Sequence, residues 1–121
     1  MSISDNIRTV TDRIASAAKR AGRDPAAVRL VVVTKTIDRG RIKEAVDAGA
    51  TVLGENRVQE AKEKIEQLGS IASWHMIGHL QANKARHAVK LFDLIHSVDN
   101  RELAEEIDRQ AAIRLPSDLW W

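Results

Sequence analysis

Leu30-Val31-Val32-Val33-Thr34-Lys35-Thr36 is the stretch that decides which fold this sequence predicts. Its three consecutive valines lack the alternation of apolar and polar residues, so we expect a strand with both faces buried, as in a parallel sheet covered by helices. The strand ends on a lysine, and a helix signal follows at Asp38. A lysine at the end of a buried strand is costly unless it has a use. Lys35 is therefore the first candidate functional residue.

Strand and helix signals alternate through the rest of the chain. The predicted strand centres, at residues 32, 52, 75 and 95, are separated by 20, 23 and 20 residues. This period predicts parallel β/α units with right-handed crossovers, and an amphipathic helix over residues 5–20 precedes them. The fold class is therefore α/β, with about four strands of a parallel sheet. The predicted strands are residues 29–34, 51–54, 73–77 and 94–98.

Polar residues before each apolar periodic segment predict where the helices begin. Ser, Thr, Asp and Asn are preferred at N-caps, and a Glu or Gln three residues later completes a capping box. The third and fifth helices begin with such a box. In chain order, the predicted N-caps are Ser4 or Asp5, then Asp38, Asn56, Asn83 and Asp99.

The composition excludes several classes of protein. The 121 residues suffice for one domain, and the net charge of +2 is only mildly basic. No run of five like charges or interleaved aromatic residues is present, so we expect no nucleic-acid partner. The apolar runs are too short for a membrane span. The chain has no cysteine and begins without a signal pattern, so we expect a cytoplasmic protein.

Ligands bind at the carboxyl ends of the strands in parallel β/α sheets. The residues there are Lys35, Glu55-Asn56, Gly78-His79 and Ser97–Asp99. A partly desolvated Lys35 amine could form a Schiff base with an aldehyde. From spacing alone, the favoured interpretation of Lys35 is a lysine whose aliphatic stem packs on the protein while its ammonium group stays in water. Asn56 could face a ligand, cap a helix, or do both.

Other polar patterns give weaker signals. His75 and His79 fall on a strand and its following loop without a third ligand, so we expect no metal site. The segment 78–85 lacks the glycine and hydroxyl residues of a nucleotide-triphosphate loop, although an anion near Asn83-Lys84 stays open. We interpret Glu55 as a solvated or lysine-paired carboxylate, and Trp74 as a core or interface residue.

Three segments together resemble a known family. They are Val33-Thr34-Lys35-Thr36, Gly54-Glu55-Asn56-Arg57-Val58-Gln59-Glu60, and Trp74-His75-Met76-Ile77-Gly78-His79-Leu80-Gln81-Ala82-Asn83-Lys84. With Ile95-His96-Ser97-Val98-Asp99 they stand in an order and at separations that closely resemble the pyridoxal-phosphate homeostasis protein family. That family has the fold of the alanine racemase N-terminal barrel.

The resemblance implies a TIM-type β/α barrel that binds pyridoxal 5′-phosphate. The family's cofactor lysine ends the first strand and corresponds to Lys35, and the family's rim near the cofactor corresponds to Asn56. The implied function is cofactor binding and vitamin B6 homeostasis without established turnover, so we expect no enzyme. A racemase would need a second acid or base opposite the lysine, and only His79 or His96 could serve. The chain contains no tyrosine, in agreement with a non-racemase.

The resemblance covers only the N-terminal half of the family's barrel. Residues 1–113 correspond to that half, and residues 114–121 form a short atypical tail, so the chain looks truncated. The family's phosphate-binding residues belong to the other half, so we expect weak cofactor binding at best. A half-barrel has two unpaired edges and an exposed apolar face, which predicts a homodimer. The alternative function is a non-catalytic assembly or scaffold domain that has lost the cofactor.

Overall fold

Helices and strands alternate along residues 2–114, which are the residues that the computed structural model describes. The strands are β1 (Val32–Val33), β2 (Val52–Glu55), β3 (Ser73–Met76) and β4 (Leu94–Ile95). The α-helices are α1 (Ile3–Arg20), α2 (Arg39–Asp47), α3 (Val58–Leu68), α4 (Ala85–Leu91) and α5 (Arg101–Arg114). Two short 3₁₀ turns, η1 (Pro25–Ala27) and η2 (Ala82–Lys84), lie before β1 and α4.

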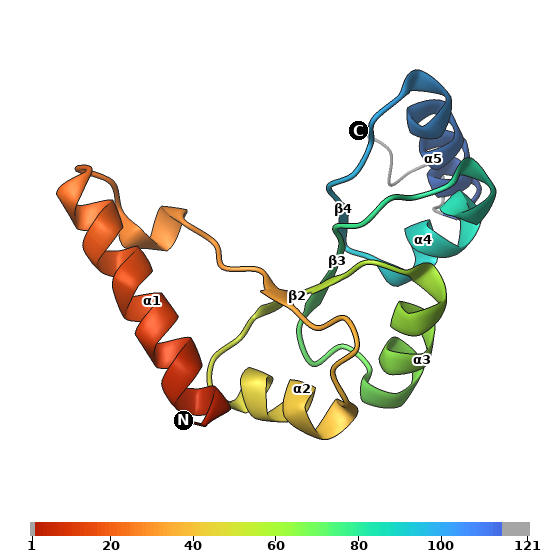
Figure 1. The fold of residues 1–121 in the computed structure, drawn as a ribbon. Helices are drawn as coiled ribbons and strands as arrows, with labels where there is room; N and C mark the ends of the chain where they lie inside the picture. The colour runs from red at the N-terminus through yellow and green to blue at the C-terminus, as the bar shows by residue number, and fades with distance from the viewer. Residues whose placement is uncertain (1, 115–121) are drawn as a thin grey trace.

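The four strands form one parallel sheet in the order β1-β2-β3-β4. Each strand is followed by a helix, and Figure 1 shows α2, α3 and α4 following one another around one side of the strands. This is the arrangement of half a TIM-type barrel preceded by a helix, so the predicted fold class is confirmed. The two edges of the sheet are β1 and β4, as expected.

The two faces of the sheet have different surroundings. Residues Val32, Leu53 and Trp74 are in register and pack into the core. The row on the opposite face is Val33, Gly54, His75 and Leu94, also in register. Its two ends are exposed, Val33 by 46% and Leu94 by 49%, whereas its middle is buried. The prediction that both faces of the first strand are buried is therefore wrong, because the helices α2–α4 lie on one side only.

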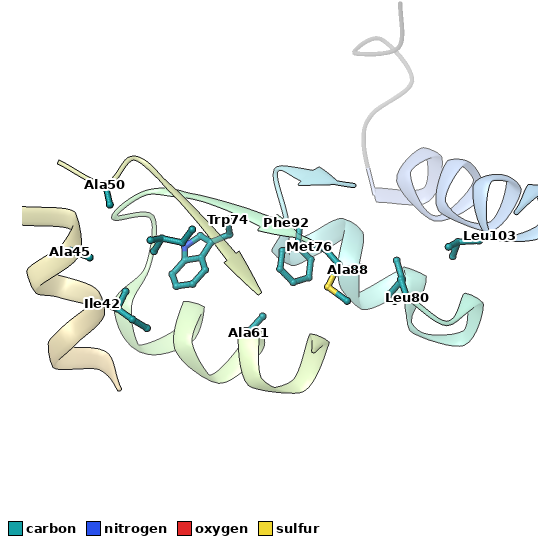
Figure 2. Packing of buried hydrophobic residues seen from close by; sticks show 11 residues of the cluster. Ile42, Ala45, Ala50, Ala61, Trp74, Met76, Leu80, Ala88, Phe92 and Leu103 are labelled. Carbon is teal, nitrogen blue, oxygen red and sulfur yellow. The ribbon is translucent and has the colours of Figure 1, made fainter. Parts of the chain in front are cut away.

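The core lies between the sheet and the helices. Trp74 and Met76 of β3 are almost fully buried against α3 and α4, as Figure 2 shows. Small residues on the helices, Ala61 and Ala88, are fully buried and let these helices approach the strands closely. The indole Nε1 of Trp74 donates a hydrogen bond of 3.1 Å to the Gly69 carbonyl, so the prediction of a core tryptophan is confirmed.

The predicted N-caps are right at one helix and wrong at four. Asp38 caps α2 by accepting a hydrogen bond of 2.9 Å from the Arg41 amide. Helix α1 begins earlier than predicted because Ser2 is its cap and Asp5 is the third helical residue of the capping box. Asn100, not Asp99, accepts from the Leu103 amide at the start of α5. The other two corrections are at α3, which starts after Arg57 rather than Asn56, and at α4, where Asn83 lies inside η2.

Residues 115–121 of the predicted tail, with Trp120 and Trp121, lie outside the described residues. The division into residues 1–113 and 114–121 stays a prediction. Within residues 2–114, none of the helices has the length and apolar character that crossing a membrane requires.

Candidate functional site

Lys35 lies in a tight turn at the carboxyl end of β1. The turn closes with a hydrogen bond of 3.0 Å from the Ile37 amide to the Thr34 carbonyl, so Lys35 and Thr36 are its central residues. Thr36 has a φ of +61°, in the left-handed region that a β-branched residue rarely adopts. Such a conformation costs about 1–3 kcal/mol and persists only where the surroundings hold it in place. The residues that contact this turn must therefore hold Thr36 in that conformation.

A buried ammonium group contacts this turn from helix α3. Lys64 Nζ donates hydrogen bonds to the Thr34 carbonyl at 2.5 Å, to Glu55 Oε2 at 2.9 Å and to Glu60 Oε2 at 2.7 Å. Lys64 is only 7% exposed, and Glu55 is fully buried at the end of β2. The Thr34 hydroxyl also donates to Glu55. Glu55 is thus the lysine-paired carboxylate of the sequence prediction and not a solvated one.

Glu60 connects the buried network to the strained residue. Its Oε2 accepts a hydrogen bond of 2.6 Å from the Thr36 backbone amide in addition to the one from Lys64. These two donors, the Lys64 ammonium first and the Thr36 amide second, hold the pKa of Glu60 below its ordinary value of 4.5. Glu60 is therefore an anion at neutral pH and a strong acceptor for the turn.

The Lys35 side chain is exposed at the rim of the sheet. Within residues 2–114, no hydrogen bond or ion pair involves its Nζ atom. Its neighbours Thr34 and Thr36 are bonded to β2 and α3, so the backbone around Lys35 is fixed while its amine is accessible. Such a lysine fits both a packed stem with a solvated charge and an amine open to a ligand. Its role stays a prediction.

Asn56 follows β2, the strand next to β1, and contacts the loop after β3. Its side chain makes no capping hydrogen bond, so the cap interpretation is wrong and the ligand interpretation remains. A Cβ atom on Gly78 would lie 2.5 Å from the Asn56 carbonyl oxygen, so only glycine allows the observed approach. Asn56 lines a cavity of about 420 Å³ together with basic side chains. These are Arg57, Lys62, His79, Lys84 and His87.

The structure brings some of the predicted rim residues together and leaves others apart. His79 Nδ1 lies 3.8 Å from Asp99 Oδ2, which joins the ends of β3 and β4. Gly78 packs on Asn56, which joins the ends of β2 and β3. Lys35 is linked to the end of β2 through its neighbour Thr34, whose hydroxyl donates a hydrogen bond to Glu55. The link does not run through Asn56. All four groups lie at the carboxyl edge of the sheet, as expected.

Two histidines whose contact the sequence did not predict lie on the sheet face opposite the core. His75 Nδ1 and His96 Nε2 are 2.9 Å apart, and the two rings are tilted with centroids 5.0 Å apart. The pKa of His75 is below its ordinary value of 6.5, first because the ring is buried and second because His96 is near. Asp93 opposes these effects. Among the described residues, no three His, Asp or Glu side chains cluster as metal ligands.

The lowered pKa of His75 predicts that stability depends on pH. The unfolded chain takes up this proton more readily than the fold does, so the contribution of neutral His75 is complete above pH 6.5 and is lost as the pH falls through the folded pKa. The urea midpoint should therefore drop when the pH is lowered below 6.5. The drop should be smaller in His75→Gln. Equal drops in both proteins would contradict the prediction.

Sequence reasoning missed Lys64, which is the centre of the buried network. Two signals were present. Lys64 lies three residues after Ala61 and four before Leu68, so it falls on the apolar stripe of α3. Glu60 precedes it by four residues, the spacing of a helical ion pair, and Glu55 ends the adjacent strand. A lysine on an apolar stripe beside two glutamates indicates a buried ion pair.

Comparison with known proteins gives consistent matches along the chain. It is 41% identical over 118 residues to the pyridoxal phosphate homeostasis protein of Escherichia coli K12, covering 94% of this chain and 50% of that protein. It is 42% identical over 115 residues to the protein of the same name from Pseudomonas aeruginosa, with the same two coverages. No family model matches the chain.

Solved structures agree with these relatives. An unknown protein from Bifidobacterium adolescentis has a TM-score of 0.85 and 41% identity, covering 93% of this chain and 50% of that one. PipY of Synechococcus elongatus, solved with PLP bound, has a TM-score of 0.71 and 45% identity, covering 84% of this chain and 49% of that one. The chain spans about half the length of the relatives it matches. Over nearly its whole length, it is therefore a relative of the pyridoxal phosphate homeostasis proteins and matches about half of each.

Proposed function

We propose that this chain binds pyridoxal 5′-phosphate through Lys35 and serves cofactor homeostasis rather than catalysis. The observation that carries the proposal is the position of Lys35: an exposed amine on a rigid turn at the carboxyl edge of a parallel β/α sheet. The relatives support it, since PipY was solved with PLP bound and the curated relatives are named for homeostasis, not for an enzymatic reaction.

The residues around the edge fit the proposed ligand. The aldehyde of the cofactor can condense with a lysine amine, with loss of water, to give an imine (Schiff-base) bond. Lys35 would supply that amine, and Asn56, whose side chain caps no helix, would contact the ligand from the adjacent strand end. The basic side chains Arg57, Lys62 and Lys84 favour an anionic ligand near Asn56. A cytoplasmic location and the absence of a nucleic-acid partner belong to the same proposal.

Reductive labelling tests this function. The protein is mixed with pyridoxal phosphate and treated with borohydride, which reduces the imine to a stable amine, and the labelled peptide is identified by mass spectrometry. We expect most of the label on Lys35. Lys35→Arg keeps the positive charge but cannot form an imine, so its label should fall to background. Lys43→Arg, an exposed lysine of α2, is the matched control and should label like the wild type.

An assembly domain without a ligand is the second candidate function. It is favoured by the exposed apolar residues Val33 and Leu94, which lie at the two edges of the sheet and are 46% and 49% exposed. A second copy of the chain could cover both, in the predicted homodimer. The labelling experiment distinguishes the candidates. Label scattered over surface lysines, or absent, would exclude cofactor binding at Lys35 and leave the assembly function.

A further inference from the structure

We propose that Glu60 and Lys64 of helix α3 are positioning residues that hold the Lys35 turn in its binding conformation. The hydrogen bonds of Glu60 and Lys64 to the backbone of the turn form a clamp. The inference rests on the proposed function for the role of Lys35, but the clamp itself is a property of the protein without a ligand.

The clamp acts on both sides of Lys35. Before it, the Thr34 carbonyl accepts from Lys64 Nζ at 2.5 Å while also closing the turn with the Ile37 amide. After it, the Thr36 amide donates to Glu60 Oε2 at 2.6 Å. The two side chains also bond to each other at 2.7 Å, so they form one hydrogen-bonded unit on α3. The backbone of Lys35 is therefore fixed from both directions by a single helix.

The left-handed conformation of Thr36 explains why a clamp is needed. A β-branched residue with a φ of +61° is strained, and the turn would relax to another conformation if nothing opposed this. Glycine would adopt the conformation without strain, but this chain has threonine. The amide of this same residue is the one that Glu60 binds. The hydrogen bond thus opposes the strain at the residue where it arises.

Burial of the charges points to a positional role rather than a stabilising one. Lys64 and Glu55 are nearly or fully removed from water, and such ion pairs are commonly no more stable than apolar residues of the same size. In the proposed clamp, the role of this network is to hold one geometry. Here that geometry includes the turn that presents the amine.

The effect of the clamp on binding depends on the populations of the turn. If the turn leaves its clamped conformation for most of the time, the apparent affinity is multiplied by the fraction of molecules in which the turn stays competent. A turn that is competent for one-tenth of the time would bind about tenfold more weakly. The amine itself would be chemically unchanged. Loss of the clamp should therefore reduce labelling of Lys35 without abolishing it, unlike Lys35→Arg.

Glu60→Ala tests the inference. Glu60 is partly exposed, and Lys64 keeps Glu55 as its partner, so we expect the variant to fold. Hydrogen exchange of the Thr36 amide, followed by NMR without any ligand, should become about tenfold faster or more as the turn opens. Reductive labelling of Lys35 by pyridoxal phosphate should need about tenfold more cofactor. Glu66→Ala, at an exposed position of the same helix, is the matched control and should change neither.

Conservative replacement separates positioning from general stability. Glu60→Gln keeps an oxygen that can accept from the Thr36 amide, so it should restore most of the exchange protection and the labelling. Unchanged Thr36 exchange in Glu60→Ala would overturn the clamp, and faster exchange with unchanged labelling would overturn its role in positioning Lys35. If the wild type is not labelled at Lys35, the proposed function fails. In that case the exchange measurement alone decides whether the clamp exists.

Discussion

Lys64→Met should lower the free energy of unfolding by about 3–5 kcal/mol, because it leaves the buried charge of Glu55 without its partner. Glu55 is fully buried, and its remaining hydrogen bond comes from the neutral Thr34 hydroxyl. Methionine has nearly the length of lysine, so the loss reflects charge rather than a cavity. The effect is large compared with the roughly 5–15 kcal/mol that stabilises a typical domain. Urea denaturation measures it directly.

Two further variants show whether the charge is responsible. The double variant Glu55→Gln, Lys64→Met removes both charges and should recover about 1–3 kcal/mol of the loss, as expected for coupled neighbours. Lys62→Met changes an exposed lysine on the same helix and should alter stability by no more than about 0.5 kcal/mol. A Lys64→Met protein as stable as the Lys62→Met control would show that the buried pair contributes nothing.

Gly78→Ala should destabilise the protein by about 1–3 kcal/mol through overpacking. The added Cβ would lie 2.5 Å from the Asn56 carbonyl oxygen and 2.7 Å from its Cα, and both are backbone atoms that no side-chain rotation can move. The ends of β2 and β3 must therefore separate. Because Asn56 and His79 both line the cavity beside this contact, the same change should alter the cavity as well.

Gly40→Ala is the matched control for Gly78→Ala. Gly40 lies in helix α2, where a Cβ would meet only the Asp38 side chain at 3.3 Å. Alanine is the better helix former, so the control should be neutral or stabilise the protein by up to about 1 kcal/mol. Thermal unfolding of both variants measures the difference. Equal melting temperatures would show that the backbones at Gly78 and Asn56 separate without cost.

The order and direction of the strands could be predicted because they depend on local signals. Apolar runs mark the strands, helical periodicity marks the crossovers, and a period of 20–23 residues gives each crossover the dozen or more residues that parallel pairing requires. Asp38 was also predictable, because its capping hydrogen bond joins residues only three apart. For Glu55 the sequence allows both a solvated and a lysine-paired carboxylate, and only the fold decides between them.

Two of the wrong predictions, and the missed Lys64 network, depend on contacts between distant segments, whereas the caps of α1, α4 and α5 are local shifts of one to three residues. The run of valines that contains Val33 is typical of a strand buried on both faces, yet Val33 is exposed. Its face would be buried only if other residues packed on the side of the sheet that α2–α4 do not cover. The spacing of Asn56 to Gln59 predicts a cap, but Asn56 lies against Gly78 and the helix starts one residue later. The Lys64 network joins three elements, and no local pattern contains all of its members.

The common direction of the four strands determines where reactive groups would lie in a closed assembly. Suppose that two copies joined β4 of each to β1 of the other, with the two-fold axis along the barrel axis. A rotation about that axis preserves the direction of the strands, so all eight strands of the ring would run parallel. Both copies of Lys35 would then open on the same side of the ring. Such a particle would present both Lys35 amines at one end of the ring and no Lys35 amine at the other.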